Sequence, residues 1–210
     1  GGKGINVDGY LTINAGTIDV ATTGSKCVYD AELDLDTSPK GIKTDGEIII
    51  NGGLLNIQVT GKSEGSEGLE SKSKITINEG EVIVHAYNVS INLGSDNPIG
   101  IEINGGKIYA ISDNNDGIDS NNKLWINGGL VIASGASGYE NGLDCDDKEN
   151  FIVKGGTLIG TGSEAIAISN SCIQKALICN DISVQAGELL VVIDETRKPI
   201  LKYEMPRTIN

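Results

Sequence analysis

The chain has 210 residues and a formal net charge of −13, with 29 glycines but a single Phe and a single Trp. Its acidic balance argues against nucleic acids and anionic membrane surfaces as partners, because both attract proteins through basic patches. No run approaches the roughly 18 consecutive apolar residues of a membrane-spanning helix, so membrane insertion is not expected. Many glycines and few aromatic side chains favour a thin, elongated core over a large globular centre.

One unit recurs along most of the chain, beginning with the first residues. Its first copy has apolar residues at alternate positions in three short segments, which begin at Ile5, Leu11 and Ile18. Alternation of this kind predicts strands, and three strands per unit predict an all-β, three-sided parallel β-helix, a solenoid with three strands in each coil. A turn that reads Asn-Gly-Gly or a close variant recurs at intervals of 23 to 37 residues, as in a solenoid. The turns lie at 14–16, 51–53, 78–80, 104–106, 127–129 and, with Lys in place of Asn, 154–156.

The Asn of each turn is interpreted as a structural residue. Asn tolerates the left-handed backbone region, and its amide can bond to the Asn of the next coil, about 4.8 Å away. We therefore expect a ladder of Asn side chains along the stack.

Residues 21–40 interrupt the repeat. Acidic residues, among them Asp34, occupy alternate positions from 30 to 36, with Ala31, Leu33 and Leu35 between them. The pattern predicts an acidic-faced strand or flap with these apolar side chains beneath it.

The repeat fades after about Asn170, following a last short strand near Ile166 and Ile168. Segments 189–193 and 200–203, joined by a turn, predict a C-terminal β-hairpin that caps the last coil. The expected organisation is therefore a β-helix domain over 1–170 and a capping segment over 171–210.

The four cysteines do not form a metal-binding pattern. Cys145 occupies a position equivalent to Ser120 in the neighbouring coil, so it is expected to be a small core residue. The sequence leaves the disulfide state of Cys27, Cys172 and Cys179 open.

Charged residues recur at the outward positions of the first strand in each unit. Equivalent positions in successive coils should form columns about 4.8 Å apart. In the early coils these columns bring opposite charges together, which predicts ordinary surface ion pairs. The expected pairs are Lys40 with Glu67, Lys43 with Glu70, and Asp45 with Lys72.

In the late coils the same columns contain acidic residues with no Lys or Arg in register. Two carboxylates about 4.8 Å apart repel each other by roughly 3.5 kcal/mol at an effective dielectric near 20, so the group must be protonated, extended into water or bound to a cation. Ca²⁺ suits the available donors, because it accepts 6 to 8 carboxylate, amide and carbonyl oxygens in loose geometry. The candidate ligands here are Asn115, Asp116, Asp119, Asn121, Asp144, Asp146 and Asp147.

Several phrases along the coil resemble the bacterial carbohydrate-binding β-helix family, which is related in fold to pectate lyases. The phrases are KGIN (3–6), PKGIK (39–43), EGLESK (67–72), NDGIDSN (115–121) and GLDCD (142–146). The resemblance implies a right-handed, single-stranded parallel β-helix with bound calcium. Glu67 and Glu70, which lie in one of these phrases, are further candidate calcium ligands. It further implies non-catalytic binding of plant cell-wall polysaccharide, acidic as in polygalacturonate or cellulosic, at the bacterial surface. Residues 88–92 lack the acidic pair of the family, so no calcium site is expected in that coil.

Two other classes of function remain open. Pectinase-type polysaccharide lyases and glycoside hydrolases share this fold, although a calcium-dependent lyase needs a base such as Arg, and the only arginines are Arg197 and Arg207. A hydrolase would use two of the clustered aspartates as acid and base, but bound Ca²⁺ would lower their pKa values and disfavour the acid role. A purely structural or adhesive surface module is the third class.

Trp125 and Tyr109 are the candidate carbohydrate-binding aromatics, because each lies between two inward apolar residues and must point outward. Exposed rings of this kind form sugar-stacking platforms. The alternative is an apolar surface that a partner covers, because isoleucines also point outward on these faces. They are Ile49, Ile83, Ile132, Ile152 and Ile159.

Overall fold

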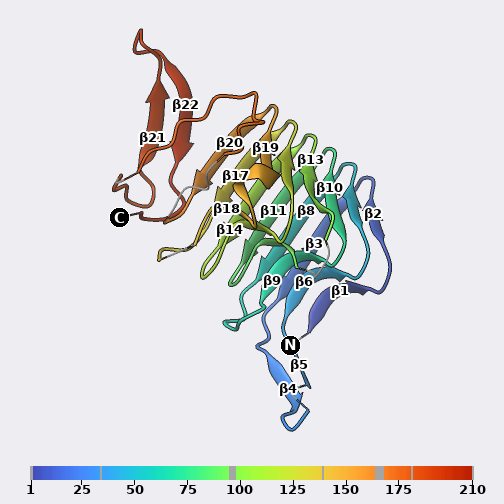
Figure 1. Cartoon of the computed structure of the whole chain (residues 1–210). Helices are drawn as coiled ribbons and strands as arrows, with labels where there is room; N and C mark the ends of the chain where they lie inside the picture. The colour runs from blue at the N-terminus through green and yellow to red at the C-terminus, as the bar shows by residue number, and fades with distance from the viewer. Residues whose placement is uncertain are drawn as a thin grey trace. The chain divides into compact units, whose positions relative to one another are not determined.

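The computed structural model describes residues 2–33, 35–94, 98–138, 140–163, 168–180 and 182–209. The chain divides into two compact units, Gly1–Ala176 and Leu177–Asn210. The first unit is a stack of coils whose strands form three parallel sheets of six strands each (Figure 1). The predicted all-β solenoid with three strands per coil is therefore confirmed.

Each sheet collects the equivalent strand of every coil. Sheet A contains β1 (Lys3–Val7), β6 (Lys40–Thr44), β9 (Glu67–Ser71), β12 (Ile91–Leu93), β15 (Ile118–Ser120) and β18 (Leu143–Cys145). Sheet B contains β2 (Leu11–Ile13), β7 (Ile48–Ile50), β10 (Lys74–Ile77), β13 (Gly100–Ile103), β16 (Leu124–Ile126) and β19 (Phe151–Val153). Sheet C contains β3 (Thr17–Thr22), β8 (Leu54–Val59), β11 (Glu81–Ala86), β14 (Lys107–Ser112), β17 (Leu130–Ser134) and β20 (Thr157–Thr161).

The core consists of inward aliphatic side chains stacked coil upon coil. Ile77, Ile103 and Ile126 occupy one position in successive strands of sheet B, and all three are fully buried. Cys145 is buried at the end of sheet A, as its position predicted. The described cysteines are all free of disulfide bonds.

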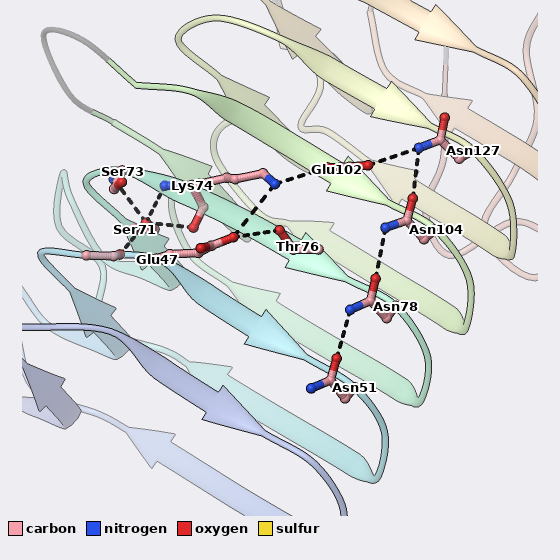
Figure 2. A network of polar contacts seen from close by, with 11 residues as sticks. Glu47, Asn51, Ser71, Ser73, Lys74, Thr76, Asn78, Glu102, Asn104 and Asn127 are labelled. Atoms are coloured by element: carbon pink, nitrogen blue, oxygen red, sulfur yellow. Dashed lines mark hydrogen bonds and ion pairs between the residues drawn. The ribbon is translucent and has the colours of Figure 1, made fainter.

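The turns between sheets B and C carry the expected Asn ladder (Figure 2). Each Asn amide donates to the side-chain oxygen of the Asn in the preceding coil, at 2.7 to 2.9 Å from Asn51 through Asn127. The expectation of a left-handed Asn is wrong. The left-handed residue is the last glycine of each turn, such as Gly106 with φ +81°. A Cβ at Gly106 would also lie only 2.6 Å from the carbonyl oxygen of Gly80. Both the positive φ and the close contact favour Gly at this position.

The excursion after β3 is a small antiparallel hairpin of β4 (Cys27–Asp30) and β5 (Leu35–Thr37) that projects from the first coils (Figure 1). The expected covering of its leucines is wrong, because Leu33 and Leu35 are 68% and 40% exposed. A two-stranded hairpin standing apart from the coil has no second layer under which to bury them. Asp34 lies outside the described residues.

A short 3₁₀ turn, η1 (Lys148–Asn150), precedes β19. Beyond β20, Ile166 lies outside the described residues, and Ile168 packs against the edge of the core. The second unit contains the predicted antiparallel hairpin, formed by β21 (Leu189–Ile193) and β22 (Pro199–Glu204). Its capping role remains a prediction. Within the described residues, no helix is both long and apolar enough to cross a membrane.

Candidate functional site

The predicted column of polar side chains on sheet A is confirmed by the strand register. Lys43, Glu70, Asn92, Asp119 and Asp144 occupy equivalent positions in five successive strands, β6 to β18. All lie between inward residues, so they share the outer face of this sheet. The column changes from basic to acidic along the stack.

The early coils form a compact ion-pair network. Lys40 lies 2.7 Å from Glu67, as expected, and also 3.1 Å from Glu70. Lys72 contacts Glu70 as well. Burial opposes ionisation of Glu70, but Lys40 and Lys72 outweigh it and lower its pKa. Burial raises the pKa of Glu67, an effect that Lys40 partly offsets.

Two of the three expected ion pairs are wrong. Lys43 pairs with Asp45 at 2.6 Å instead of with Glu70, and Lys72 pairs with Glu70 instead of with Asp45. Residues two apart in a strand point to the same face, so Lys43 reaches Asp45, and Lys72 reaches Glu70, within a single coil.

The late coils bring four carboxylates together on sheet A, and we call Asp116, Asp119, Asp144 and Asp146 the acidic cluster. Within the described part of the chain, no Lys or Arg forms an ion pair with any of them. Burial, together with the charges of Asp116, Asp144, Asp146 and Glu67, raises the pKa of Asp119 to about 7. These carboxylates therefore act on one another, as the columns predicted.

Asp116 is the most buried member, at 7% exposure. Burial raises its pKa to about 6, although the backbone N–H of Asn141 donates to its Oδ1 at 2.5 Å. Burial also raises the pKa of Asp144, against hydrogen bonds from the Cys145 backbone and the Asn141 side chain. Asn141 thus holds two members of the cluster.

Of the predicted ligands, Glu67 and Glu70 are engaged by Lys40 and Lys72 in the early coils. Three more stand apart from the cluster or are engaged elsewhere. Asp147 is the N-cap of η1, where its Oδ1 accepts from the backbone N–H of Glu149 at 3.0 Å. Asn115 accepts from the backbone N–H of Asp116 at 2.8 Å. Asn121 is exposed just after β15. None of the three is among the groups that shift the pKa of Asp119.

Asn92 and Asn141 are the polar residues of this face that the ligand set omitted. Their side-chain Oδ1 atoms are buried without a hydrogen-bond partner among the described residues. A buried polar oxygen without a protein partner can accept a hydrogen bond from water or coordinate a cation. The sequence could have indicated both residues. Asn92 shares the column of Asp119, and Asn141 precedes the Gly of its coil just as Asp116 does in the preceding coil.

The oxygen donors on this face are of the kind that bind a hard cation. Carboxylate and amide oxygens are the ligands that Ca²⁺ prefers, and no imidazole or thiolate for Zn²⁺ belongs to the cluster. Among the described residues, however, no three acidic, His or Cys groups form a ready-made metal site. Binding would require the aspartate side chains to turn toward a common point.

The two aromatic candidates lie on different sheets. Trp125 is on β16 of sheet B, between Glu102 and Ile152 of the neighbouring coils. Tyr109 is on β14 of sheet C, between Ile83 and Ile132. The structure therefore does not bring the two rings to one platform. Both are partly exposed.

The outward isoleucines are only partly accessible. Ile49, Ile83 and Ile152 are half-buried. Ile132 and Ile159 are buried, at 8% and 7% exposure, so the expected apolar surface does not extend over them.

Residues 1–88 match a family model described as "Carbohydrate-binding domain-containing protein". The match covers less than half of the chain. It contains Glu67 and Glu70 and ends before the acidic cluster and Trp125. Neither the curated proteins nor the solved structures include a match to the chain. The family match supports carbohydrate binding, with a glycan as the partner.

Proposed function

We propose that this β-helix binds plant cell-wall polysaccharide without cleaving it, and that the acidic cluster holds Ca²⁺ for this purpose. The observation that carries the proposal is the convergence of Asp116, Asp119 and Asp144, which form no ion pair with a Lys or Arg among the described residues. Within the same residues, the side-chain oxygens of Asn92 and Asn141 are buried without a hydrogen-bond partner. A bound divalent cation would relieve the mutual repulsion of these carboxylates. The carbohydrate-binding match at residues 1–88 supports a glycan as the ligand.

The charge of the chain favours a cation-bridged polyanion at this face. A protein with a net charge of −13 repels polygalacturonate over long distances. Cations shared between the late-coil carboxylates and the uronate groups would reverse that repulsion locally. Asp116, Asp119 and Asp144 would hold the cation, and Asn141 would orient two of these carboxylates. Such a binding protein belongs at the bacterial surface, where the polysaccharide is met.

Polygalacturonate binding should therefore vanish in chelator and fall at least tenfold in Asp119→Ala, because the variant removes the carboxylate at the centre of the cluster, a loss of about 1.4 kcal/mol or more. The check is isothermal titration with oligogalacturonate in millimolar Ca²⁺ and in EDTA. Asp8→Ala is the matched control, because it removes the same charge from an exposed position before the acidic coils. Full binding in EDTA would contradict the bridging role.

The pKa of Asp119, raised to about 7, favours a second candidate, a pectinase-type hydrolase. A carboxyl that keeps its proton near neutral pH beside ionised neighbours can serve as a general acid. In that case oligogalacturonate incubated with the protein in EDTA should release reducing ends, and Asp119→Asn should abolish the release. Unsaturated products would indicate a lyase, and intact oligosaccharide would support binding alone.

A further inference from the structure

The outer face of sheet B carries a second organised polar surface, which Figure 2 shows in part. Its middle column contains Thr12, Ile49, Thr76, Glu102, Trp125 and Ile152, one from each coil. Hydrogen-bonding, aliphatic and aromatic side chains thus follow one another along the stack. We call this surface the sheet-B face.

The charged side chains of this face are fixed by mutual contacts. Lys74 lies 3.1 Å from Glu102 and 3.7 Å from Glu47. Thr76 donates to Glu47 at 2.9 Å, and Asn127 donates to Glu102 at 3.3 Å. Side chains that are already ordered lose little conformational entropy when a ligand binds.

An aromatic ring lies directly beyond this network. Trp125 occupies the coil next to Glu102, and the Lys123 ammonium lies 5.1 Å from its ring centroid. Tyr10 immediately precedes β2 and is 76% exposed. β16 and β2 are four coil steps apart in sheet B, a distance of roughly 19 Å at about 4.8 Å per coil.

The Asn ladder borders the middle column and adds a row of regularly spaced donors. An Asn side chain has two N–H groups, and the ladder bond uses one of them. Asn51 and Asn104 are exposed, so a second N–H remains available to a ligand in each of these coils.

The charge on the sheet-B face favours a neutral ligand. Glu47 and Glu102 share Lys74, and Lys123 adds a positive charge beside Trp125. The positive and negative charges of these residues are therefore equal in number. By contrast, the whole chain carries a net charge of −13 and the cluster on sheet A is acidic. Aromatic rings combined with hydroxyl, amide and carboxylate groups match the apolar ring faces and hydroxyl edges of a neutral sugar.

We propose that the sheet-B face binds a neutral polysaccharide chain that lies along the stack, anchored on Trp125. The inference rests on the proposed function for the premise that the ligand is a carbohydrate. It assigns the neutral glycan to a different sheet from the acidic cluster, and it requires no cation there. The direction follows from the face itself, because the Asn donors repeat along the stack, and Trp125 and Tyr10 lie in coils four steps apart.

The test is isothermal titration in EDTA with neutral disaccharides and hexasaccharides of the cello, xylo and manno series. At least one hexasaccharide should bind, and Trp125→Ala should lower its affinity roughly tenfold or more, as for a central aromatic anchor. Tyr10→Ala should lower the affinity for the hexasaccharide but leave the affinity for the disaccharide unchanged, because only the longer ligand reaches from Trp125 toward the first coil. Tyr29→Ala is the matched control, because Tyr29 is a 64% exposed ring in the projecting hairpin. Melting curves confirm that the variants fold.

Unchanged affinity in Trp125→Ala, an equal loss in Tyr29→Ala, or an absolute need for Ca²⁺ would each overturn the assignment to sheet B. Calcium-dependent binding of oligogalacturonate with no neutral ligand bound would overturn this inference and leave the proposed function intact. Binding of no glycan in Ca²⁺ or in EDTA would overturn both.

Discussion

Raising the pH from about 5 to about 8 in chelator should destabilise the coil. The pKa values of Asp116 and Asp119 are raised from 3.8 to about 6 and about 7. Over this range the folded protein holds protons that the unfolded chain has already released, so stability falls as the pH rises. One pKa unit corresponds to about 1.4 kcal/mol, so Asp119 alone accounts for roughly 3 kcal/mol between pH 5 and pH 8.

Thermal melting at the two pH values in EDTA checks this result. The melting temperature should fall by roughly 5–10 °C for a domain of this size. Glu70, whose pKa is lowered, opposes the trend only at lower pH, because it is ionised in both states above about pH 5. Asp119→Asn should flatten the pH dependence and raise the melting temperature at pH 8, whereas Asp8→Asn should do neither. A protein more stable at pH 8 than at pH 5 in EDTA would contradict the raised pKa values of Asp116 and Asp119.

Ile126→Asp should unfold the coil around β16, whereas Trp125→Asp should be tolerated for folding. Ile126 is fully buried and stacks between Ile103 and Val153 of the neighbouring coils. An unpaired carboxylate there is among the most costly changes in a core, more than about 4 kcal/mol. Trp125, one position earlier, points to solvent.

Circular dichroism and urea unfolding of the two variants measure the difference. Because each coil of a solenoid depends on its neighbours, the loss in Ile126→Asp should spread to β13 and β19. An equal loss of structure in both variants would mean that the strand register is shifted by one residue.

The strands of the coil could be predicted because alternation and turn spacing repeat in every unit. One copy such as 48–57 is ambiguous alone, but the same pattern in later coils fixes which residues are inward. The column from Lys43 to Asp144 followed from the same alignment, since parallel strands in register place equivalent residues side by side.

Side-chain partners within a column were harder to predict. Lys43 and Glu70 are adjacent in register, yet Lys43 bonds to Asp45. A long side chain can contact neighbours in the same strand or in the next strand, and residue spacing alone does not show which contact forms. The N-cap role of Asp147 was missed for a similar reason, because local backbone bonding competes with the column.

The separation of Trp125 from Tyr109 was missed, although the turns in the sequence carry it. Both residues alternate with inward aliphatic residues, and alternation alone shows only that each points outward. Which of the three sheets a residue belongs to depends on its place relative to the turn at 104–106 or 127–129. Tyr109 follows its turn and lies on sheet C, whereas Trp125 precedes its turn and lies on sheet B.

The calcium dependence of the melting temperature at pH 8 tests most directly whether the acidic cluster holds a cation. A ligand that binds only the folded state stabilises it by about 2.7 kcal/mol at 100 times its Kd. The melting temperature of the wild type should therefore rise by roughly 5–10 °C from EDTA to millimolar Ca²⁺. Asp8→Asn should show the same rise, and Asp119→Asn should lose it while starting from a higher value in EDTA. A wild-type melting temperature that is the same in Ca²⁺ and in EDTA would contradict the proposed site.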